Sequence, residues 1–316
     1  MSPISHILCA VDFSESSRHA LAQAAAVAQA YDAGVTVLYA VVNRPAMDLP
    51  PVSLGDAEQE RLVEDLRHFS ESVAPSLSAS YSVREAVSAH DAILDAVDDI
   101  DPDLLVMGTH GRSGFRRLFL GSVTEKVIRS VPCPTLVVPP AVSPSIDTPT
   151  RFRRLLCAVD LSESSLAALA RALDLAQETA AQVLVLHVVE MPLAPPELPP
   201  EMDRSAMADR AAKEAVRRLQ ELIPADAGRR CTVETPIVYG RAYREIVRVA
   251  AERHADVIVM GVHGRGPMDL MLFGSTTHHV LRASTSPVLV VHSEDGAAAL
   301  RQFREQDRRL RPVQGD

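Results

Sequence analysis

The sequence has no tryptophan, few aromatic residues and few cysteines, and each scarcity excludes a class of protein. Aromatic residues make up 4% of the chain, which excludes a nucleic-acid binder that relies on base stacking. The four cysteines are too scattered for a disulfide framework and form no CxxC pair, so a reducing compartment fits. No apolar run approaches the roughly 18–20 residues of a membrane helix. We therefore expect a cytoplasmic protein that binds no membrane.

An excess of positive charge is also absent. The chain carries 32 Lys and Arg against 41 Asp and Glu, a formal net charge of −9. Through residue 148 there are 10 basic and 19 acidic residues, whereas the remainder is balanced. A nucleic-acid partner requires a basic face, so we expect none. Any anion that binds here must be held by local features of its site.

The chain contains the same unit twice. Its 316 residues are too many for one small domain and suit two of about 150. Residues 7–17 match residues 155–165 at nine of eleven positions, and the hexapeptide at 107–112 recurs with one change at 260–265. The chain is therefore a tandem duplication.

The duplication fixes the domain boundaries and the fold class that we expect. Residues 139–150 are rich in Pro, Ser and Thr, as a linker is. We predict one domain over residues 1–145, a second over 151–295 and a C-terminal tail over 296–316. In each copy, five short runs rich in β-branched residues alternate with four stretches of helical periodicity. This alternation predicts an α/β fold, with a doubly wound parallel sheet flanked by helices in each domain.

Candidate binding residues follow the first and fourth predicted strands, because open parallel sheets bind ligands beyond the carboxyl ends of their strands. An aspartate ends the first strand of each copy, Asp12 and Asp160. The simpler interpretation of these aspartates is an N-cap of the following helix. Both roles can coexist.

A glycine motif with the spacing G-x2-G-x9-G-S follows the fourth strand in each copy. Its members are Gly108, Gly111, Gly121 and Ser122 in the first copy and Gly261, Gly264, Gly274 and Ser275 in the second. Glycines let the backbone approach a ligand, and a helix that begins at Gly-Ser offers unpaired N–H groups to a phosphate. The alternative is a plain turn with a serine cap.

The residues between the glycines differ in charge between the copies. The first copy has Arg112, Arg116 and Arg117, whereas the second has Arg265 and the opposing Asp269. By loop charge, the first copy is the better polyphosphate site.

The glycine motif together with the A-V-D-x-S-E segment of each half resembles the universal stress protein family in its tandem form. The resemblance implies a five-stranded sheet of order 3-2-1-4-5, the adenine nucleotide alpha hydrolase-like fold, and a site for ATP or another adenine nucleotide, with or without Mg²⁺. It places the adenine and ribose against Asp12 and Ala40, or Asp160 and Val188. It places the phosphates against the glycine loops and against Ser122-Val123 or Ser275-Thr276.

One position departs from the family pattern. The family often has a small residue after the third strand, which is Gly240 in the second copy, but Val87 occupies that place in the first. We therefore expect two sites of unequal affinity.

Enzymatic function is not expected. The chain has no G-x4-G-K-[ST] motif and no SGGxDS loop, and its two lysines, Lys126 and Lys213, lie at no strand end. No catalytic base is evident, so ATP hydrolysis is expected to be slow or absent. Three hypotheses stay open at this point: a nucleotide-binding regulator of the stress response, a nucleotide-free interaction scaffold, and a slow ATPase.

Two further expectations concern assembly and side-chain chemistry. The fifth strand of each copy is apolar and lies at a sheet edge, so each copy can cover the edge strand of the other, which makes a pseudo-dimer within one chain. Two chains can in addition form a homodimer. His278 and His279 are adjacent on a helix and are not expected to chelate a metal together. Cys9 and Cys157 lie in the first strand of each copy and are expected to be core residues.

Overall fold

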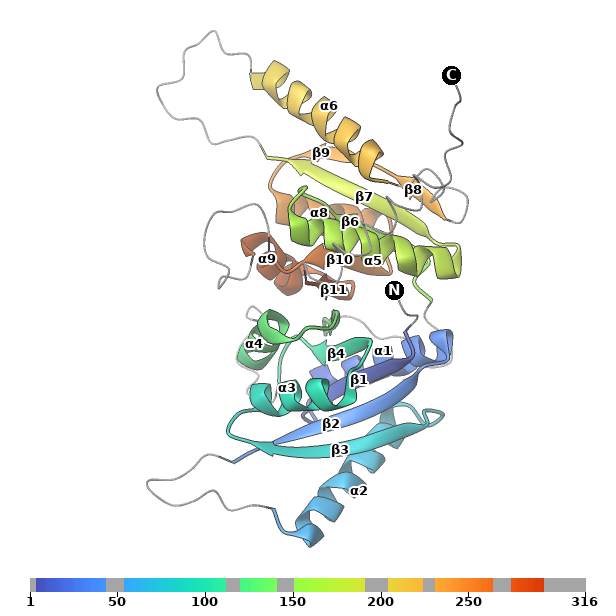
Figure 1. Ribbon diagram of the computed structural model, residues 1–316, viewed down its shortest axis with the longest axis vertical. Helices are drawn as coiled ribbons and strands as arrows, with labels where there is room; N and C mark the ends of the chain where they lie inside the picture. Colours follow the sequence, from blue (N-terminus) through green and yellow to red (C-terminus); the bar gives the residue numbers. More distant parts are fainter. Residues whose placement is uncertain are drawn as a thin grey trace, which may run out of the picture. The chain divides into compact units, whose positions relative to one another are not determined.

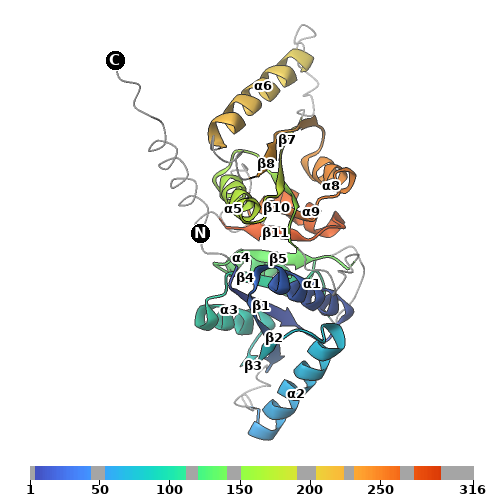
Figure 2. The same cartoon turned by 90° about the vertical axis from the view of Figure 1, so that its right-hand side faces the viewer.

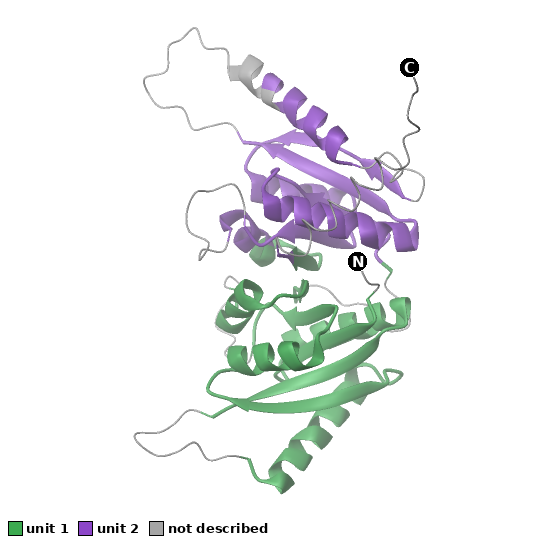
Figure 3. Ribbon diagram, in the orientation of Figure 1, with its two compact units in different colours: residues 1–151, 281–290 green, residues 152–280, 291–316 purple. Residues whose placement is uncertain are grey.

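The computed structural model describes seven stretches of the chain and divides it into two compact units. The described stretches are residues 4–43, 54–111, 120–140, 151–190, 204–223, 231–263 and 274–292. The first unit comprises residues 1–151 with 281–290, and the second comprises 152–280 with 291–316 (Figure 3). Most of the predicted linker and the predicted tail 296–316 lie outside the described residues.

The first repeat alternates strands and helices as the periodicity predicts. Its strands are β1 (His6–Val11), β2 (Gly34–Val42), β3 (Ala79–Ala86), β4 (Leu104–Gly108) and β5 (Thr135–Val138). Its helices are α1 (Glu15–Tyr31), α2 (Asp56–Val73), α3 (Ala89–Ile100) and α4 (Ser122–Ser130). The strands pair in parallel in the order β3-β2-β1-β4-β5, which confirms the predicted topology.

The second repeat has the same plan with one difference. Its strands are β6 (Arg154–Ala158), β7 (Gln182–Val189), β8 (Thr232–Glu234), β9 (Ile237–Tyr239), β10 (Val257–Gly261) and β11 (Val288–Val291). Its helices are α5 (Glu163–Thr179), α6 (Arg204–Leu222), α8 (Ala242–Glu252) and α9 (Ser275–Ala283). The strand order is β8-β7-β6-β10-β11. The third strand is split into β8 and β9 around Pro236, because proline has no N–H to give to a ladder.

Helices cover both faces of the first unit's sheet (Figure 2). Helices α1 and α2 lie on one face and α3 and α4 on the other. The strands β4 and β10 are buried at every residue, which explains why their sequences are unbroken apolar runs. The many alanines of the chain suit this packing, since most of the alanines in α1 and α5 are buried.

Among the residues with a described structure, no helix is both long and apolar enough to span a membrane.

Strand β5 is not left as a bare edge. Within the first unit, β11 pairs antiparallel with it, so that Val288 lies opposite Val137 and Leu289 opposite Leu136. This apolar strand is therefore covered within the first unit.

The cysteine thiols are buried, and their reactivity is a first testable expectation. Cys9 and Cys157 lie in β1 and β6, and burial raises the pKa of Cys9 to about 12 and also raises that of Cys157. Cys133 and Cys231 are buried as well. Because the thiolate is the reactive form, the native protein should not react with a chromogenic disulfide reagent at pH 8, whereas four thiols should titrate in denaturant. A thiol that reacts rapidly in the native protein would contradict this.

Candidate functional site

The aspartate after β1 is held by the turn that leads into α1. Asp12 Oδ1 accepts a hydrogen bond from the Ser14 N–H at 3.1 Å. The N-cap of α1 is Ser14 itself, whose side chain accepts from the Ser17 N–H. The N-cap interpretation of Asp12 is therefore wrong. The helix is capped two residues later, and the Asp12 carboxylate stays at the carboxyl end of the strand.

The second repeat reproduces this turn. Asp160 Oδ1 accepts from both the N–H and the hydroxyl of Ser162, at 2.9 and 2.5 Å, and Ser162 caps α5. In both turns the intervening residue has a positive φ, 64° at Phe13 and 66° at Leu161. A bulky residue in this left-handed region is uncommon and costs free energy, so the surrounding turn must impose the conformation.

The strand register brings the second predicted position beside the aspartate. Because Val11 pairs with Tyr39 on β2, Asp12 lies level with Ala40. In the second repeat Ala158 pairs with Leu186, which places Asp160 level with Val188 two residues later. Both Ala40 and Val188 are half-buried. The two residues that the family resemblance assigns to adenine and ribose therefore share one end of the sheet in each repeat.

The glycine loop reaches the aspartate in the first repeat. A Cβ atom added to Gly111 would lie 2.6 Å from Asp12 Oδ2, closer than any side chain allows without a shift. Only a glycine therefore fits beside this carboxylate as it is placed. The equivalent Gly264 lies outside the described residues, as do Arg112 and Arg265.

The strand-end glycines Gly108 and Gly261 have a different reason to be glycine. A Cβ on Gly108 would overlap Ser16 Oγ and lie 2.9 Å from the Ser16 carbonyl oxygen, and a Cβ on Gly261 would lie 2.5 Å from the Ser164 carbonyl carbon. These contacts are with the first turn of α1 and of α5. Close approach of helix and strand explains this pair of glycines without any ligand.

The last helix of each repeat presents an N-terminus beside the glycine loop. Gly121 is the N-cap of α4, no side chain caps it, and its own N–H donates to the Thr109 carbonyl oxygen at 2.8 Å. The predicted alternative of a serine cap is therefore wrong, because Ser122 is the first residue inside the helix. Ser122 is exposed and Val123 half-buried. The first-turn N–H groups of α4, which have no helical partner, are thus placed to meet an anion.

The second repeat has the matching arrangement at α9. The Gly274 N–H donates to the Val262 carbonyl oxygen at 3.1 Å, and Ser275 and Thr276 begin the helix. A threonine one turn in anchors each helix to its strand, Thr124 to the Gly108 carbonyl oxygen at 3.0 Å and Thr277 to that of Gly261 at 2.9 Å. Sequence reasoning missed both threonines, although they occupy the same place in the two copies.

The loops after the third strand differ between the repeats. Gly240 has a φ of +148°, and a Cβ there would lie 2.9 Å from Glu245 Cγ. Glu190, at the end of β7, accepts the Ala242 N–H at 2.6 Å and so anchors the start of α8. In the first repeat the places of Glu190 and Gly240 are taken by Val42 and Val87, which are 45% and 59% exposed. At these two places the second repeat therefore has a carboxylate and a glycine, whereas the first has two exposed valines.

The adjacent histidines of α9 do not converge. Their rings are nearly perpendicular, at 89°, and His279 Nδ1 contacts the Ser275 carbonyl oxygen at 2.5 Å. Within the described stretches, no group of three His, Cys, Asp or Glu side chains could hold a metal ion.

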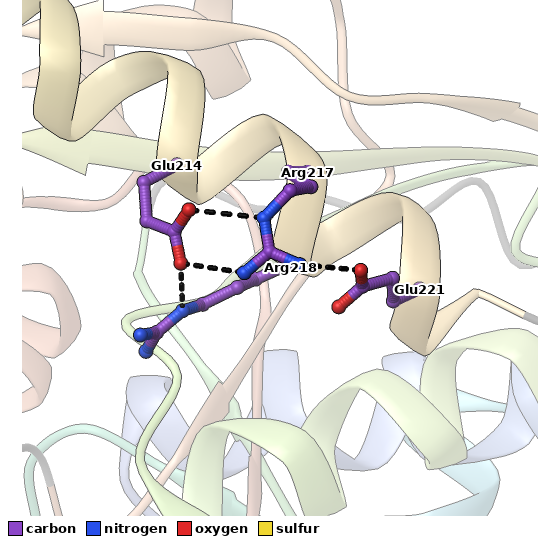
Figure 4. Close-up of polar contacts among 4 residues, drawn as sticks. All are labelled: Glu214, Arg217, Arg218 and Glu221. Carbon is purple, nitrogen blue, oxygen red and sulfur yellow. Dashed lines mark hydrogen bonds and ion pairs between the residues drawn. The ribbon is translucent and has the colours of Figure 1, made fainter.

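A large pKa shift lies elsewhere, on the exposed side of α6 (Figure 4). Glu214 accepts hydrogen bonds from both Arg217 and Arg218, which lowers its pKa to about 2, and Arg217 also contacts Glu221. This is an ion-pair network on a helix surface at i, i+3 and i, i+4 spacing. A shifted pKa in this chain can therefore come from a surface ion-pair network alone.

Comparison with known proteins identifies the family. The model described as the universal stress protein family matches residues 3–139 and again residues 151–292. Universal stress protein Rv2005c of Mycobacterium tuberculosis is 31% identical over 201 residues, which cover 60% of this chain and 62% of that protein. Universal stress protein Rv2319c of the same organism is 24% identical over 282 residues, which cover 86% and 94%.

Solved structures agree on the fold. A universal stress protein from Archaeoglobus fulgidus has a TM-score of 0.60 at 22% identity and covers 92% of this chain and 97% of its own. A structure from Pseudomonas aeruginosa has a TM-score of 0.61 at 21% identity, with coverage of 95% and 98%. Both show the adenine nucleotide alpha hydrolase-like fold that the sequence resemblance implied. Because the family model matches both repeats over most of the chain, the protein belongs to the universal stress protein family in its tandem form.

Proposed function

We propose that each repeat binds ATP or a related adenine nucleotide and that the protein acts as a regulatory module of the stress response. One observation carries the proposal. Around the carboxyl end of β1, the Asp12 carboxylate, the backbone of Gly111 and the N-cap Gly121 gather within one small region, with Gly121 packed on His110. The Asp12 carboxylate lies so close to Gly111 that a side chain at residue 111 would collide with it, so the carboxylate and the glycine loop are direct neighbours at this end of the sheet.

The chemistry of this region suits the two ends of a nucleotide. A carboxylate accepts hydrogen bonds from ribose hydroxyls or an adenine amino group. The N-terminus of α4 offers N–H donors and the positive end of a helix dipole to phosphate oxygens. The sequence adds Arg112, Arg116 and Arg117 between the glycines. We assign the base and ribose to Asp12 and Ala40 and the phosphates to the glycine loop, Ser122 and Val123.

The second repeat is proposed to bind with a different affinity. Asp160, Val188 and the start of α9 repeat the arrangement, but this repeat has Glu190 and Gly240 where the first has Val42 and Val87. Its glycine loop has one arginine and an opposing aspartate, Arg265 and Asp269. Fewer cations beside the phosphates weaken an electrostatic contact.

Binding without rapid turnover completes the proposal. The chain has two lysines, Lys126 in α4 and Lys213 in α6, and neither stands at the end of a strand. Hydrolysis requires a base positioned against an attacking water. Among the described residues of this region, the Asp12 carboxylate accepts from the Ser14 N–H and the His110 ring contacts the Thr109 hydroxyl at 2.9 Å, so we expect neither to act as that base. A Mg²⁺ ion, where present, would be held through the phosphates.

The test combines ligand extraction with two matched variants. Mass spectrometry of the supernatant from purified, denatured protein should detect an adenine nucleotide, and calorimetric titration of stripped protein with ATP should resolve two affinities. In Ser122→Asp, a carboxylate at the first turn of α4 repels phosphate while favouring the helix, so first-site affinity should fall at least about tenfold without loss of stability. Ser275→Asp should do the same to the second site.

Two outcomes would overturn the proposal. An extract without adenine nucleotide, together with no heat on titration with ATP, would leave the scaffold interpretation. Phosphate release well above background that disappears in Ser122→Asp would instead assign turnover to the first site.

A further inference from the structure

The edge strand β3 of the first unit is long, and no strand among the described residues pairs with its outer side. It runs for eight residues in register with β2, contains neither proline nor glycine, and none of its residues is fully buried. Figure 1 shows it as the last strand of the first unit's sheet. The second repeat protects the same edge, because Pro236 divides its third strand into two pieces of three residues. The third strand is thus continuous in the first repeat and interrupted by proline in the second.

The outward backbone groups of β3 can be identified from its pairing with β2. The Asn43 N–H donates to the Ala86 carbonyl oxygen at 2.9 Å, so Ala86 directs its backbone groups toward β2. Because these directions alternate along an extended strand, the odd-numbered residues direct theirs outward. They are Ala79, Tyr81, Val83 and Glu85. In the described part of the chain, no backbone bond outside the regular ladders reaches these four residues.

We propose that β3 pairs antiparallel with β3 of a second copy of this chain, with the two-fold axis at Ser82. This register places Tyr81 opposite Val83 of the second copy and Ala79 opposite Glu85. Each of these pairs joins two outward-directed residues, which can exchange two hydrogen bonds as an antiparallel ladder requires. Ser82 then lies opposite Ser82 of the second copy in a non-hydrogen-bonded pair.

The side chains favour this self-pairing over pairing with an unrelated strand. Tyr81 opposite Val83 is an aromatic pair with a β-branched residue, which stabilises antiparallel ladders. No like charges meet, since Arg84 lies opposite Ser80 and is already paired with Asp99 at 2.9 Å in its own chain. The edge is therefore complementary to itself, as a two-fold interface must be.

The fold already covers an edge in this way. Strand β5, at the opposite end of the first repeat's sheet, is covered by the antiparallel strand β11. Pairing at β3 would cover the opposite edge of this sheet in the same antiparallel way, with a strand of a second chain.

A single-cysteine cross-link tests the register. Opposed residues of a non-hydrogen-bonded antiparallel pair have Cα atoms about 4.5 Å apart, within the range that a disulfide spans. Ser82→Cys should therefore form a disulfide-linked dimer under a copper–phenanthroline oxidant, on a non-reducing gel. Ser80→Cys is the matched control, because the two copies of residue 80 would lie about 13 Å apart at roughly 3.3 Å per residue. The four native thiols are buried and should not contribute.

Sedimentation of the full-length chain tests the interface without a cross-link. The chain should sediment as a dimer that dissociates on dilution, and Val83→Pro, which removes an outward N–H, should raise the dissociation constant about tenfold or more. Ile237→Pro makes the same change at an outward position of β9 and should leave the dimer intact. A monomer at all concentrations, or equal cross-linking of the two cysteine variants, would overturn the proposal. A monomer that instead captures a strand of another protein counts against it equally.

Discussion

Gly261→Ala should lower the free energy of unfolding of the second repeat by about 2 kcal/mol or more, within or above the usual cost of overpacking. The added Cβ would lie 2.5 Å from the Ser164 carbonyl carbon and 2.7 Å from its oxygen. These are backbone atoms in the first turn of α5, so the conflict is relieved only if the helix moves away from β10. For a unit of this size the melting temperature should fall by roughly 4–10 °C, measured by calorimetry or circular dichroism.

Gly34→Ala provides the comparison for this substitution. Gly34 begins β2, and a Cβ there would have its nearest neighbour, the Ser5 carbonyl oxygen, at 3.8 Å. That variant should be neutral or slightly stabilising, because alanine restricts the unfolded chain. Equal melting temperatures for Gly261→Ala and Gly34→Ala would show that α5 and β10 do not approach as closely as described. A confirmed loss would mean that the first glycine of the motif is required by packing, whatever the site binds.

The fold could be predicted because its signals are local and occur twice. Strand runs such as residues 104–108 are unbroken and apolar, and the alternation with helical periodicity allowed few topologies. The repeat of ILCAVDFSESS as LLCAVDLSESS required the two halves to share one plan. The strand order followed from the family resemblance, and the register then placed Asp12 level with Ala40.

The details of the site depended on contacts between distant residues, and these were not predictable. An aspartate before a serine is as good an N-cap candidate as the serine, and only the geometry assigns the cap to Ser14. The seryl side chain of Ser16, which excludes a Cβ at Gly108, is 92 residues away in sequence. The carboxylate of Glu190 anchors α8 across 52 residues. A hydrophobicity pattern carries no information about such pairs.

The split of the third strand in the second repeat is a different kind of miss. CTVETPIVY reads as one strand because its β-branched residues continue across the proline, and the structure divides it at Pro236. Pro236 is visible in the sequence, and its missing N–H is the physical cause of the division.

Gly111→Ala should lower the affinity of the first site for ATP by about 10- to 100-fold, the range of one hydrogen bond to a charged group. The added Cβ would lie 2.6 Å from Asp12 Oδ2, the end of a side chain that can rotate away. Rotation relieves the clash with little loss of stability but moves the carboxylate from the position assigned to the base and ribose. Calorimetric titration of the stripped variant with ATP gives the affinity, and a melting curve without nucleotide should match that of the wild type.

A double-mutant cycle separates this effect from general damage to the loop. Asp12→Ala should weaken the first site by a similar factor, and Gly111→Ala should add little in that background, because the carboxylate it displaces is already gone. The second site serves as an internal reference, since Asp160 has its own turn and its affinity should not change. Additive losses in the cycle would mean that Gly111 acts on the nucleotide through its own backbone. Unchanged affinity in Gly111→Ala would remove Asp12 from the site, and with it the contact on which the assignment of the base and ribose end depends.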